Sequence, residues 1–225
     1  AGHLGEGLMR TLRAEGVDAV GLDVLRSPYT DLTGSIADRA LVRRAMDGID
    51  AVVHAATLHK PHVGSHTRQE FVDATITGTL NLLEKAVDAN ISRFVFTSTT
   101  STFGRALTPA AGAPAAWITE DVVPVPKNIY GITKIAAESL CELAFRERGL
   151  ALIVLRTARF FPEADDNAGI RNAFEPANAQ LNELLNRRAD IADVVSAHLP
   201  AVERAPAIGF GRFIISATTP FAPED

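Results

Sequence analysis

Short apolar runs that do not alternate with polar residues constrain the fold of this chain most strongly. The runs stand at residues 17–22, 51–55, 93–96 and 151–155. A strand with one face in water alternates apolar and polar residues, so continuous runs predict strands that are buried on both faces. Strands of this kind occur in parallel sheets that are covered by helices.

Helix-length segments separate these runs. Apolar residues recur in them at roughly helical spacing, at Leu4, Leu8 and Leu12, at Leu80, Leu83 and Val87, and at Ile135, Leu140, Leu143 and Ala144. The alternation predicts a doubly wound, Rossmann-type α/β fold with a parallel sheet and right-handed crossovers. Residues 191–203 are expected to form a further helix and 212–216 a further strand. The aperiodic stretch 105–126, rich in Pro and Ala, is expected to form a surface loop over a site.

The composition excludes several classes of function. The net charge is -5 and no long basic run is present, so neither nucleic acid nor an anionic membrane is expected as a partner. No apolar stretch approaches the roughly 20 residues that span a bilayer. Cys141 is the only cysteine, which rules out an intrachain disulfide and favours a reducing, cytoplasmic location.

The chain opens with two glycines, Gly2 and Gly5, that lead directly into an amphipathic helix. This pattern matches the end of a G-x-x-G-x-x-G turn, in which backbone approaches a pyrophosphate at a helix N-terminus. Gly2, Leu4 and Gly5 are therefore candidate cofactor-binding residues, although a plain glycine turn gives the same pattern.

The first strand and first glycine of such a motif have no residues in the sequence. A central strand cannot simply be omitted, because each unpaired buried backbone group costs roughly 1–3 kcal/mol. We therefore expect the polypeptide to start before Ala1 and to continue past Asp225. The strands that end near Asp23 and Ala55 should not pair with each other.

Asp23 follows a predicted strand about 20 residues after the glycines. A carboxylate at this position accepts hydrogen bonds from the ribose hydroxyls of NAD and repels the 2′-phosphate of NADP. A solvated turn residue is the alternative, and the nearby Arg26 leaves NADP possible. The sequence thus predicts a dinucleotide-binding domain over 1–160 and a small substrate-binding lobe over 161–225, some of whose segments return to the sheet.

Tyr130 and Lys134 lie four residues apart and so share one helix face. A phenol with a pKa near ~10 is a poor base at neutral pH, but a nearby ammonium group favours the phenolate. Such a tyrosine exchanges a proton with a substrate oxygen while hydride moves to or from a nicotinamide. An exposed helix pair is the alternative.

A run of hydroxyl residues follows the apolar run 93–96 and ends before Gly104. The carboxyl end of a parallel strand is where α/β sheets bind ligands, so one hydroxyl there is expected to hold a substrate oxygen beside Tyr130. The alternative is a turn in which these side chains bond local backbone.

At this point the sequence resembles the extended short-chain dehydrogenase/reductase family, the NAD-dependent epimerases and dehydratases. The resemblance extends over nearly the whole chain. It rests on Gly2 and Gly5, Asp23, Val53-His54-Ala55-Ala56, Gly78-Thr79, the segment 98–104, Glu120 and Pro124, Tyr130-Gly131-x-x-Lys134 and Asp190-Ile191-Ala192-Asp193-Val194.

The resemblance implies a role for each matching position. Tyr130 would be the catalytic acid/base, Lys134 would lower its pKa and bind the nicotinamide ribose, and Thr99 would be the catalytic hydroxyl. Among the cofactor contacts, Ser35 and Ile36 would lie along the adenine. Ala55, Ala56 and Thr57 would lie near the nicotinamide ribose and the phosphates.

Several positions depart from the family pattern. Ser35 stands where the family usually has Asp, Thr75 where it has Asn, and Phe103 where it has Tyr. Arg159 stands where nucleotide-sugar enzymes commonly have Asn, which argues against a nucleotide-sugar substrate. His59, Thr100 and Arg159 are the residues expected to contact substrate.

The histidines at 54, 59, 62 and 66 have no zinc-like spacing and no acidic or cysteine partner among them, so no metal is expected. A second hypothesis places the segment 59–62 with Arg159, Arg187 and Arg188 in a basic pocket for a carboxylate or phosphate. Solvated surface charges are the alternative.

The sequence therefore predicts an NAD(P)-dependent enzyme that transfers hydride to or from a polar hydroxyl or carbonyl compound, such as a sugar or sugar derivative. NAD is the expected cofactor. A non-catalytic NAD(P)-binding sensor on the same fold is the alternative, since fold does not fix function. The helical segments near 67–90 and 128–148 would suit the homodimer that is usual in the family.

Overall fold

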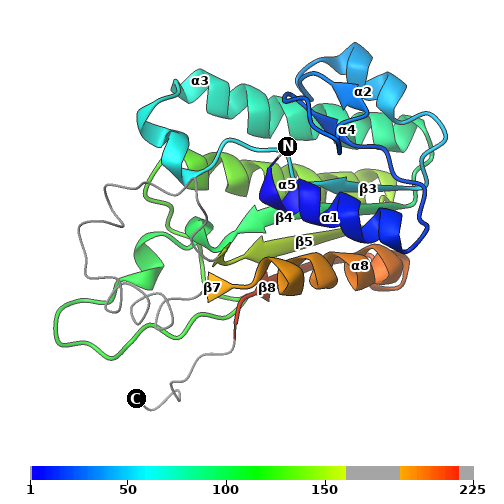
Figure 1. Cartoon of the computed structure of the whole chain (residues 1–225). Coiled ribbons are helices and arrows are strands. Elements are labelled where there is room, and N and C mark those ends of the chain that lie inside the picture. Colours follow the sequence, from blue (N-terminus) through cyan, green and yellow to red (C-terminus); the bar gives the residue numbers. More distant parts are fainter. Residues whose placement is uncertain (1, 161–187, 218–225) are drawn as a thin grey trace.

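The computed structural model describes residues 2–160 and 188–217, and a four-stranded parallel sheet forms its centre (Figure 1). The strands lie in the order β3 (Ala51–His54), β4 (Arg93–Thr99), β5 (Leu152–Thr157) and β8 (Phe210–Ile215). All three pairings are parallel. The Rossmann-type α/β fold predicted from the apolar runs is confirmed.

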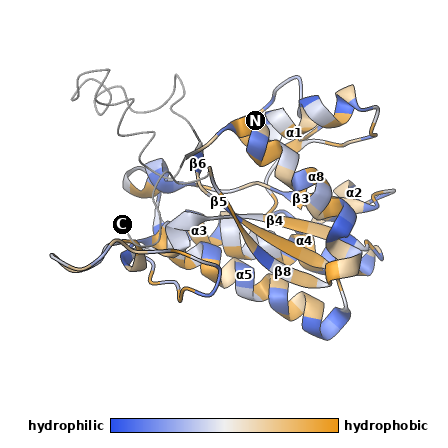
Figure 2. Cartoon of the chain, turned by 90° about the horizontal axis from the view of Figure 1, so that it is seen from below, coloured by the Kyte–Doolittle hydropathy of each residue, from blue (hydrophilic) through white to orange (hydrophobic). Residues whose placement is uncertain are grey.

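Helices cover both faces of this sheet. On one face lie α4 (Gly78–Asp88) and α5 (Ile129–Arg148), and on the other lie α1 (His3–Ala14) and α8 (Ile191–Ile208). Side chains of β4 alternate between these layers, because Phe94 and Phe96 pack with α4 and α5 whereas Val95 packs with α8. The apolar colouring of β4 and β5 between the helices is visible in Figure 2.

Shorter elements connect this framework. Helix α2 (Arg39–Ala45) precedes β3, and α3 (Arg68–Phe71) continues through the π-helical turn η2 (Val72–Thr77) into α4. Three 3-10 turns stand at η1 (Lys60–Gly64), η3 (Thr100–Thr102) and η4 (Arg105–Leu107). After η4, residues 108–126 form no helix or strand, as predicted, apart from one bridge between Gly104 and Val125.

Two small parallel pairs lie outside the main sheet: β1 (Leu22–Asp23) with β2 (Leu32–Thr33), and β6 (Arg159–Phe160) with β7 (Arg188–Ala189). The predicted strand over 17–22 is therefore wrong for most of its length. Val17 and Val20 are about half exposed, and residues 17–20 have no strand partner among the described residues. An apolar run is buried on both faces only where neighbouring strands hold it inside a sheet.

The expectation that the strands ending near Asp23 and Ala55 do not pair is confirmed, because β1 pairs with β2 and β3 pairs with β4. The expected helix over 191–203 is confirmed and extends to Ile208. Of the expected substrate lobe, 161–187 and 218–225 lie outside the described residues, whereas α8 and β8 return to the sheet. No helix of the described ranges has the length and apolar character needed to cross a bilayer.

Candidate active site

The predicted catalytic residues meet at the carboxyl edge of the sheet. Strand β3 ends at His54, opposite Phe96, while β4 continues for three more residues to Thr99, which pairs with Thr157 of β5. Helix α5 begins at this same edge (Figure 1). The edge is the place where parallel α/β sheets bind ligands.

Local sequence fixes where α5 begins. The side chain of Asn128 caps the helix by accepting a hydrogen bond from the backbone N–H of Gly131 at 3.1 Å. A Cβ on Gly131 would lie 2.9 Å from Pro126 and 3.2 Å from the carbonyl oxygen of Ser101. The glycine therefore lets the loop before the helix and the turn η3 pack closely against the first turn of α5. This arrangement directs Tyr130 and Lys134 inward.

Lys134 is a fully buried cation. Its Nζ donates a hydrogen bond to the backbone oxygen of Thr97 at 2.8 Å and lies 4.6 Å from the centre of the Phe96 ring. Burial lowers the pKa of Lys134 to about 7, while the charge of Glu138 acts in the opposite direction. Burial makes the charged form of Lys134 unfavourable, and perturbed ionisable groups of this kind are typical of functional sites.

Tyr130 is buried next to Thr99. Burial raises the pKa of Tyr130 to about 12, and a side-chain hydrogen bond with Thr99 counteracts part of that rise. Thr99 Oγ1 also accepts a hydrogen bond from the backbone N–H of Ser101 at 3.1 Å. The predicted lowering of the Tyr130 pKa by Lys134 does not arise from the chain's own residues, because burial dominates and Lys134 bonds Thr97 instead.

A buried ionic cluster lies one turn beyond Lys134, and the sequence reasoning missed it. Glu138 accepts hydrogen bonds from Ser98 Oγ at 2.5 Å and from Arg156 Nη2 at 2.7 Å. Glu138 and Arg156 are both almost fully buried. The sequence did contain a signal for Glu138. Tyr130, Lys134 and Glu138 follow one another at four-residue steps, which places all three on one face of the helix.

His54 and His198 are also buried at this edge, on opposite faces of the sheet. His54 Nε2 bonds the hydroxyl of Thr79 at 2.9 Å, and burial lowers the pKa of His54 to about 3. His198 Nε2 bonds the hydroxyl of Thr97 at 2.8 Å, and burial lowers its pKa as well. Both rings are therefore neutral at pH 7 and hold the strand ends in place.

The glycine turn presents open backbone at the start of α1. Gly2 caps the helix in an extended conformation without a side-chain cap, and a Cβ on Gly2 or Gly5 would meet nothing within 4 Å. Leu4 is buried against α8, which holds the helix against the sheet layer. The first-turn N–H groups of a helix lack intrahelical partners, so this end suits an anionic group.

The other predicted cofactor residues lie on two segments. Asp23 ends β1 half-buried, and its Oδ1 accepts a hydrogen bond from the backbone N–H of Leu25. Ser35 is exposed, whereas the side chain of Ile36 is in the core. Asn81, which sequence reasoning missed, donates to the backbone oxygens of Ile36 and Ala37 and so fixes that segment on α4.

Residues 55–57 follow β3 at the carboxyl edge and are half-buried. Ala55 and Ala56 pack against different core clusters, and the Thr57 hydroxyl donates to the backbone oxygen of Leu58.

The loop over 105–126 is tied to β8 by Glu120, which accepts a hydrogen bond from the backbone N–H of Ile214.

The residues expected to contact substrate also lie at this edge. Thr100 follows Thr99 directly, and Arg159 in β6 stands two residues beyond the end of β5. His59 is exposed at the start of η1. Arg187 lies outside the described residues, so the predicted basic pocket stays a prediction.

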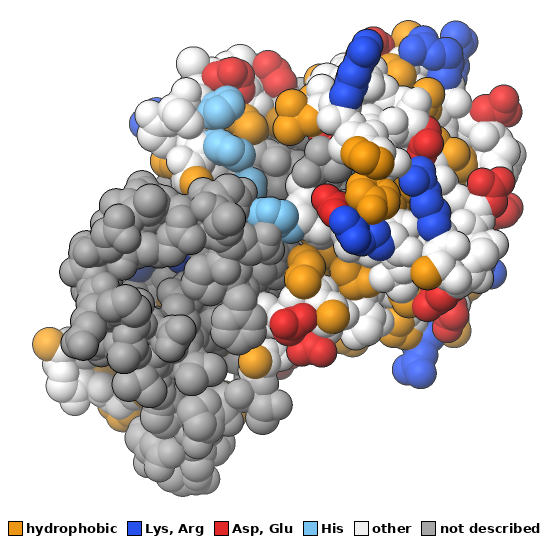
Figure 3. Space-filling view, viewed as in Figure 1, with side chains coloured by type: hydrophobic (Ala, Val, Ile, Leu, Met, Phe, Trp, Pro, Cys, Tyr) orange, Lys and Arg blue, Asp and Glu red, His pale blue; other side chains and the backbone are white. Residues whose placement is uncertain are grey.

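Histidine side chains form a row that runs from the upper left to the middle of the surface in Figure 3. The His62 ring contacts those of His59 and His66 at 4.6 and 4.9 Å between centroids. Burial and then the nearby His66 lower the pKa of His62, so its ring favours the neutral form. In residues 2–160 and 188–217 no group of three or more His, Cys, Asp or Glu side chains is placed to hold a metal ion.

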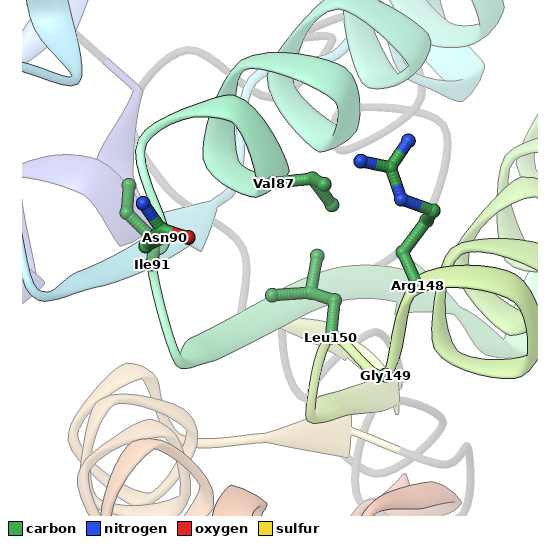
Figure 4. Close-up of a pocket in the computed structure, with 6 residues that line it drawn as sticks. All are labelled: Val87, Asn90, Ile91, Arg148, Gly149 and Leu150. Atoms are coloured by element: carbon green, nitrogen blue, oxygen red, sulfur yellow. The ribbon is translucent and has the colours of Figure 1, made fainter.

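A pocket of about 310 Å³ lies at the opposite edge of the sheet (Figure 4). Its lining includes Val87 at the end of α4, Ile91 just before β4 and Leu150 just before β5. These residues precede the amino ends of the strands. The pocket is therefore separate from the edge where Thr99 and Tyr130 meet.

The chain is similar to several known proteins. The model of the NAD dependent epimerase/dehydratase family matches residues 1–208. A UDP-glucose 4-epimerase of Lactobacillus helveticus is 31% identical over 166 residues, which cover 69% of this chain and 48% of that protein. A 4-hydroxy-2-methyl-3-oxo-4-farnesyl-3,4-dihydroquinoline-1-oxide ketoreductase of Stigmatella aurantiaca is 29% identical over 223 residues, covering 92% of this chain and 63% of the relative. The chain thus spans about half to two thirds of these relatives' lengths.

Solved structures share the fold. A crystal structure of UDP-glucose 4-epimerase superposes with a TM-score of 0.78 at 20% identity, covering 99% of this chain and 76% of the other. The UDP-glucose 4-epimerase from Brucella ovis, solved in complex with NAD, gives a TM-score of 0.76 at 21% identity, covering 96% and 75%. At these identities the likeness establishes the fold.

Lys134→Met should change how stability depends on pH. Because the pKa of Lys134 falls to about 7 on folding, the unfolded chain binds more protons between pH 7 and the ordinary lysine value of ~10.4. The free energy of unfolding of the wild type should therefore rise with pH in that window relative to Lys134→Met, by on the order of 3 kcal/mol.

Urea unfolding of both proteins from pH 6 to 9.5 measures this difference. Lys127→Met, at an exposed lysine, is the matched control and should run parallel to the wild type. A constant difference between the wild type and Lys134→Met across the range would show that the buried ammonium carries no such penalty.

Proposed function

Because the chain belongs to the NAD-dependent epimerase/dehydratase family, we propose that it transfers hydride to or from a polar hydroxyl or carbonyl compound, a sugar or sugar derivative. One observation carries the proposal: Tyr130, its hydrogen-bond partner Thr99 and the buried Lys134 meet at the carboxyl edge of the sheet. A protein that only sensed a nucleotide would have no need of a buried tyrosine and hydroxyl at this position.

The residues at the start of α1 fit a dinucleotide. The open backbone at Gly2 and Gly5 would receive the pyrophosphate, and Asp23 would accept hydrogen bonds from the ribose hydroxyls. Lys134 and the segment 55–57 would lie along the nicotinamide ribose. NAD, when bound, supplies or accepts the hydride.

The chain's own residues would handle the proton. With a pKa raised to about 12, the Tyr130 phenol holds its proton at neutral pH and can donate it to the oxygen of a carbonyl substrate, which becomes a hydroxyl. In the reverse direction the phenolate oxygen takes the proton of a substrate hydroxyl. Thr99 would orient that substrate oxygen, and Lys134 would hold the nicotinamide ribose beside the phenol.

The substrate would lie between the end of β4 and the segments that bear His59 and Arg159. Arg159 offers a planar set of donors that suits a carboxylate or phosphate. We therefore include sugar acids and sugar phosphates among the candidate substrates. In an epimerase the hydride returns to the same compound, whereas in a dehydrogenase it leaves with the exchanged cofactor. Retention of NAD through turnover would distinguish the first case from the second.

We also propose a homodimer formed through α4 and α5. Leu80 on α4 and Ile132 and Leu143 on α5 are exposed apolar side chains, which suits a helix-to-helix interface. Leu80→Glu with Leu143→Glu should then convert a dimer to a monomer in sedimentation equilibrium. A wild-type protein that sediments as a monomer at tens of micromolar would contradict the proposal.

Tyr130→Phe tests the catalytic assignment. The variant keeps the ring and removes the group that exchanges the proton, so turnover should fall by about 10²–10⁴ while the fold is unchanged. The assay follows NADH absorbance with panels of sugars, sugar acids and sugar phosphates. Tyr29→Phe, at the only other tyrosine of the chain, is the matched control and should keep its activity. Near-normal turnover of Tyr130→Phe would refute the mechanism.

Asp23 should make NAD bind more tightly than NADP, because a carboxylate beside a 2′-phosphate repels it. Asp23→Asn should reduce the ratio of NAD affinity to NADP affinity by about tenfold or more. Titration of both cofactors against the wild type, Asp23→Asn and the distant Asp47→Asn control measures it. A clear NADP preference of the wild type would mean that Arg26 governs this part of the site.

A further inference from the structure

The buried face of α5 carries three polar side chains at four-residue intervals. Tyr130, Lys134 and Glu138 are all less than a tenth exposed, and they run inward from the carboxyl edge of the sheet. The first two belong to the proposed catalytic site. Glu138 does not, yet its carboxylate is as deeply buried as the lysine.

Glu138 is held by both neighbouring strands. Ser98 of β4 donates to Oε1 at 2.5 Å, and Arg156 of β5 donates through Nε and Nη2 at 2.7 to 3.2 Å. Arg212 of β8 adds a contact of 3.5 Å between its Nε and Oε2. Ser98 and Arg156 are paired in the sheet register and lie directly beside Thr99 and Thr157. The carboxylate therefore ties α5 to the strand that carries Thr99.

Glu138 is the one anion close to Lys134 among the described residues around it. From β3, His54 is neutral, since its pKa is about 3. On α5, burial raises the pKa of Cys141, so its thiol is uncharged. β4 contributes the Thr97 carbonyl and the Phe96 ring, and α8 contributes His198, which burial keeps neutral. The charged groups of β5 and β8, Arg156 and Arg212, are engaged with Glu138 and with Glu142.

We propose that Glu138 is a positioning residue for the Tyr130 and Lys134 pair: its clamped carboxylate fixes α5 against β4 and keeps the buried Lys134 ammonium charged. The inference rests on the proposed function, in which Lys134 lies along the nicotinamide ribose beside Tyr130. Attraction between opposite charges is strong where water is absent, so one carboxylate offsets part of the cost of burying the lysine.

Glu138→Gln removes the charge and keeps the shape, so it separates charge from packing. The chain contains four lysines, at 60, 85, 127 and 134, so ¹³C-lysine labelling gives a spectrum in which Lys134 is identified by its absence from Lys134→Met. The ¹³Cε shift of Lys134 is then followed against pH without any substrate. We expect the midpoint near pH 7 in the wild type to fall by about one pH unit or more in Glu138→Gln.

Two variants serve as controls. Glu142→Gln removes a half-exposed carboxylate one turn further along the same helix and should leave the Lys134 midpoint unchanged. Glu138→Asp keeps the charge and should restore most of the wild-type midpoint. If Glu138→Gln keeps its circular dichroism spectrum and Lys134 titrates at the wild-type pH, the proposal is wrong.

An unpaired Arg156 can also prevent Glu138→Gln from folding. In that case the double variant Glu138→Gln with Arg156→Met removes both buried charges, which folded proteins commonly tolerate. With the Cys141 thiol uncharged, Glu138 is the group that raises the pKa of Lys134 against burial, so the midpoint should still fall. A double variant that folds and shows no fall overturns the proposal.

The same experiment keeps the two proposals apart. The titration of Lys134 needs neither cofactor nor turnover, so a fall in its midpoint supports the role of Glu138 even if no substrate is found. An unchanged midpoint in a protein whose Tyr130→Phe variant has lost turnover refutes the role of Glu138 and leaves the proposed function intact.

Discussion

The hydrogen bond from Lys134 to the backbone oxygen of Thr97 is the interaction on which the site depends. A buried ammonium needs a hydrogen-bond acceptor. In a strand in the middle of a sheet, the backbone carbonyls normally accept hydrogen bonds from the neighbouring strands. Strand β3 stops at His54, opposite Phe96, whereas β4 continues to Thr99. No β3 pairing takes up the Thr97 oxygen, so it is left for Lys134. The unequal lengths of two adjacent strands thus create the position of the cation.

Thr97 also joins the two helical layers. Its carbonyl bonds α5 through Lys134 on one face, while its hydroxyl bonds α8 through His198 on the other. Two residues later Thr99 reaches the phenol of Tyr130. A displacement of either helix would therefore disturb the same three residues of β4. The geometry of the candidate site is fixed by the sheet and both layers together rather than by a loop.

The sequence predicted what is local or periodic. Unbroken apolar runs indicated the parallel sheet, and a four-residue interval placed Tyr130 and Lys134 on one face. It did not predict the partners of Glu138, because Ser98 and Arg156 are 40 and 18 residues away and meet it only through strand register. Arg156 falls just after an apolar run. The prediction of a buried strand at Val17 failed for a related reason. Burial depends on neighbouring strands, and the sequence pattern does not specify which strands those are.

The polar face of α5 is difficult to explain by stability. Apolar residues of similar size in place of a buried ion pair are often neutral or stabilising, and Glu138, Arg156 and Lys134 are all almost fully buried. Among the described residues Arg156 Nη1 has no hydrogen-bond partner, which adds to the cost. Around them, Phe94, Leu152 and Ala137 form an ordinary apolar core, so the polar groups are confined to the line that ends at Tyr130. A costly line of buried polar groups that leads to one phenol supports the proposed proton-transfer role, because ionisable groups with perturbed pKa values cluster at functional sites.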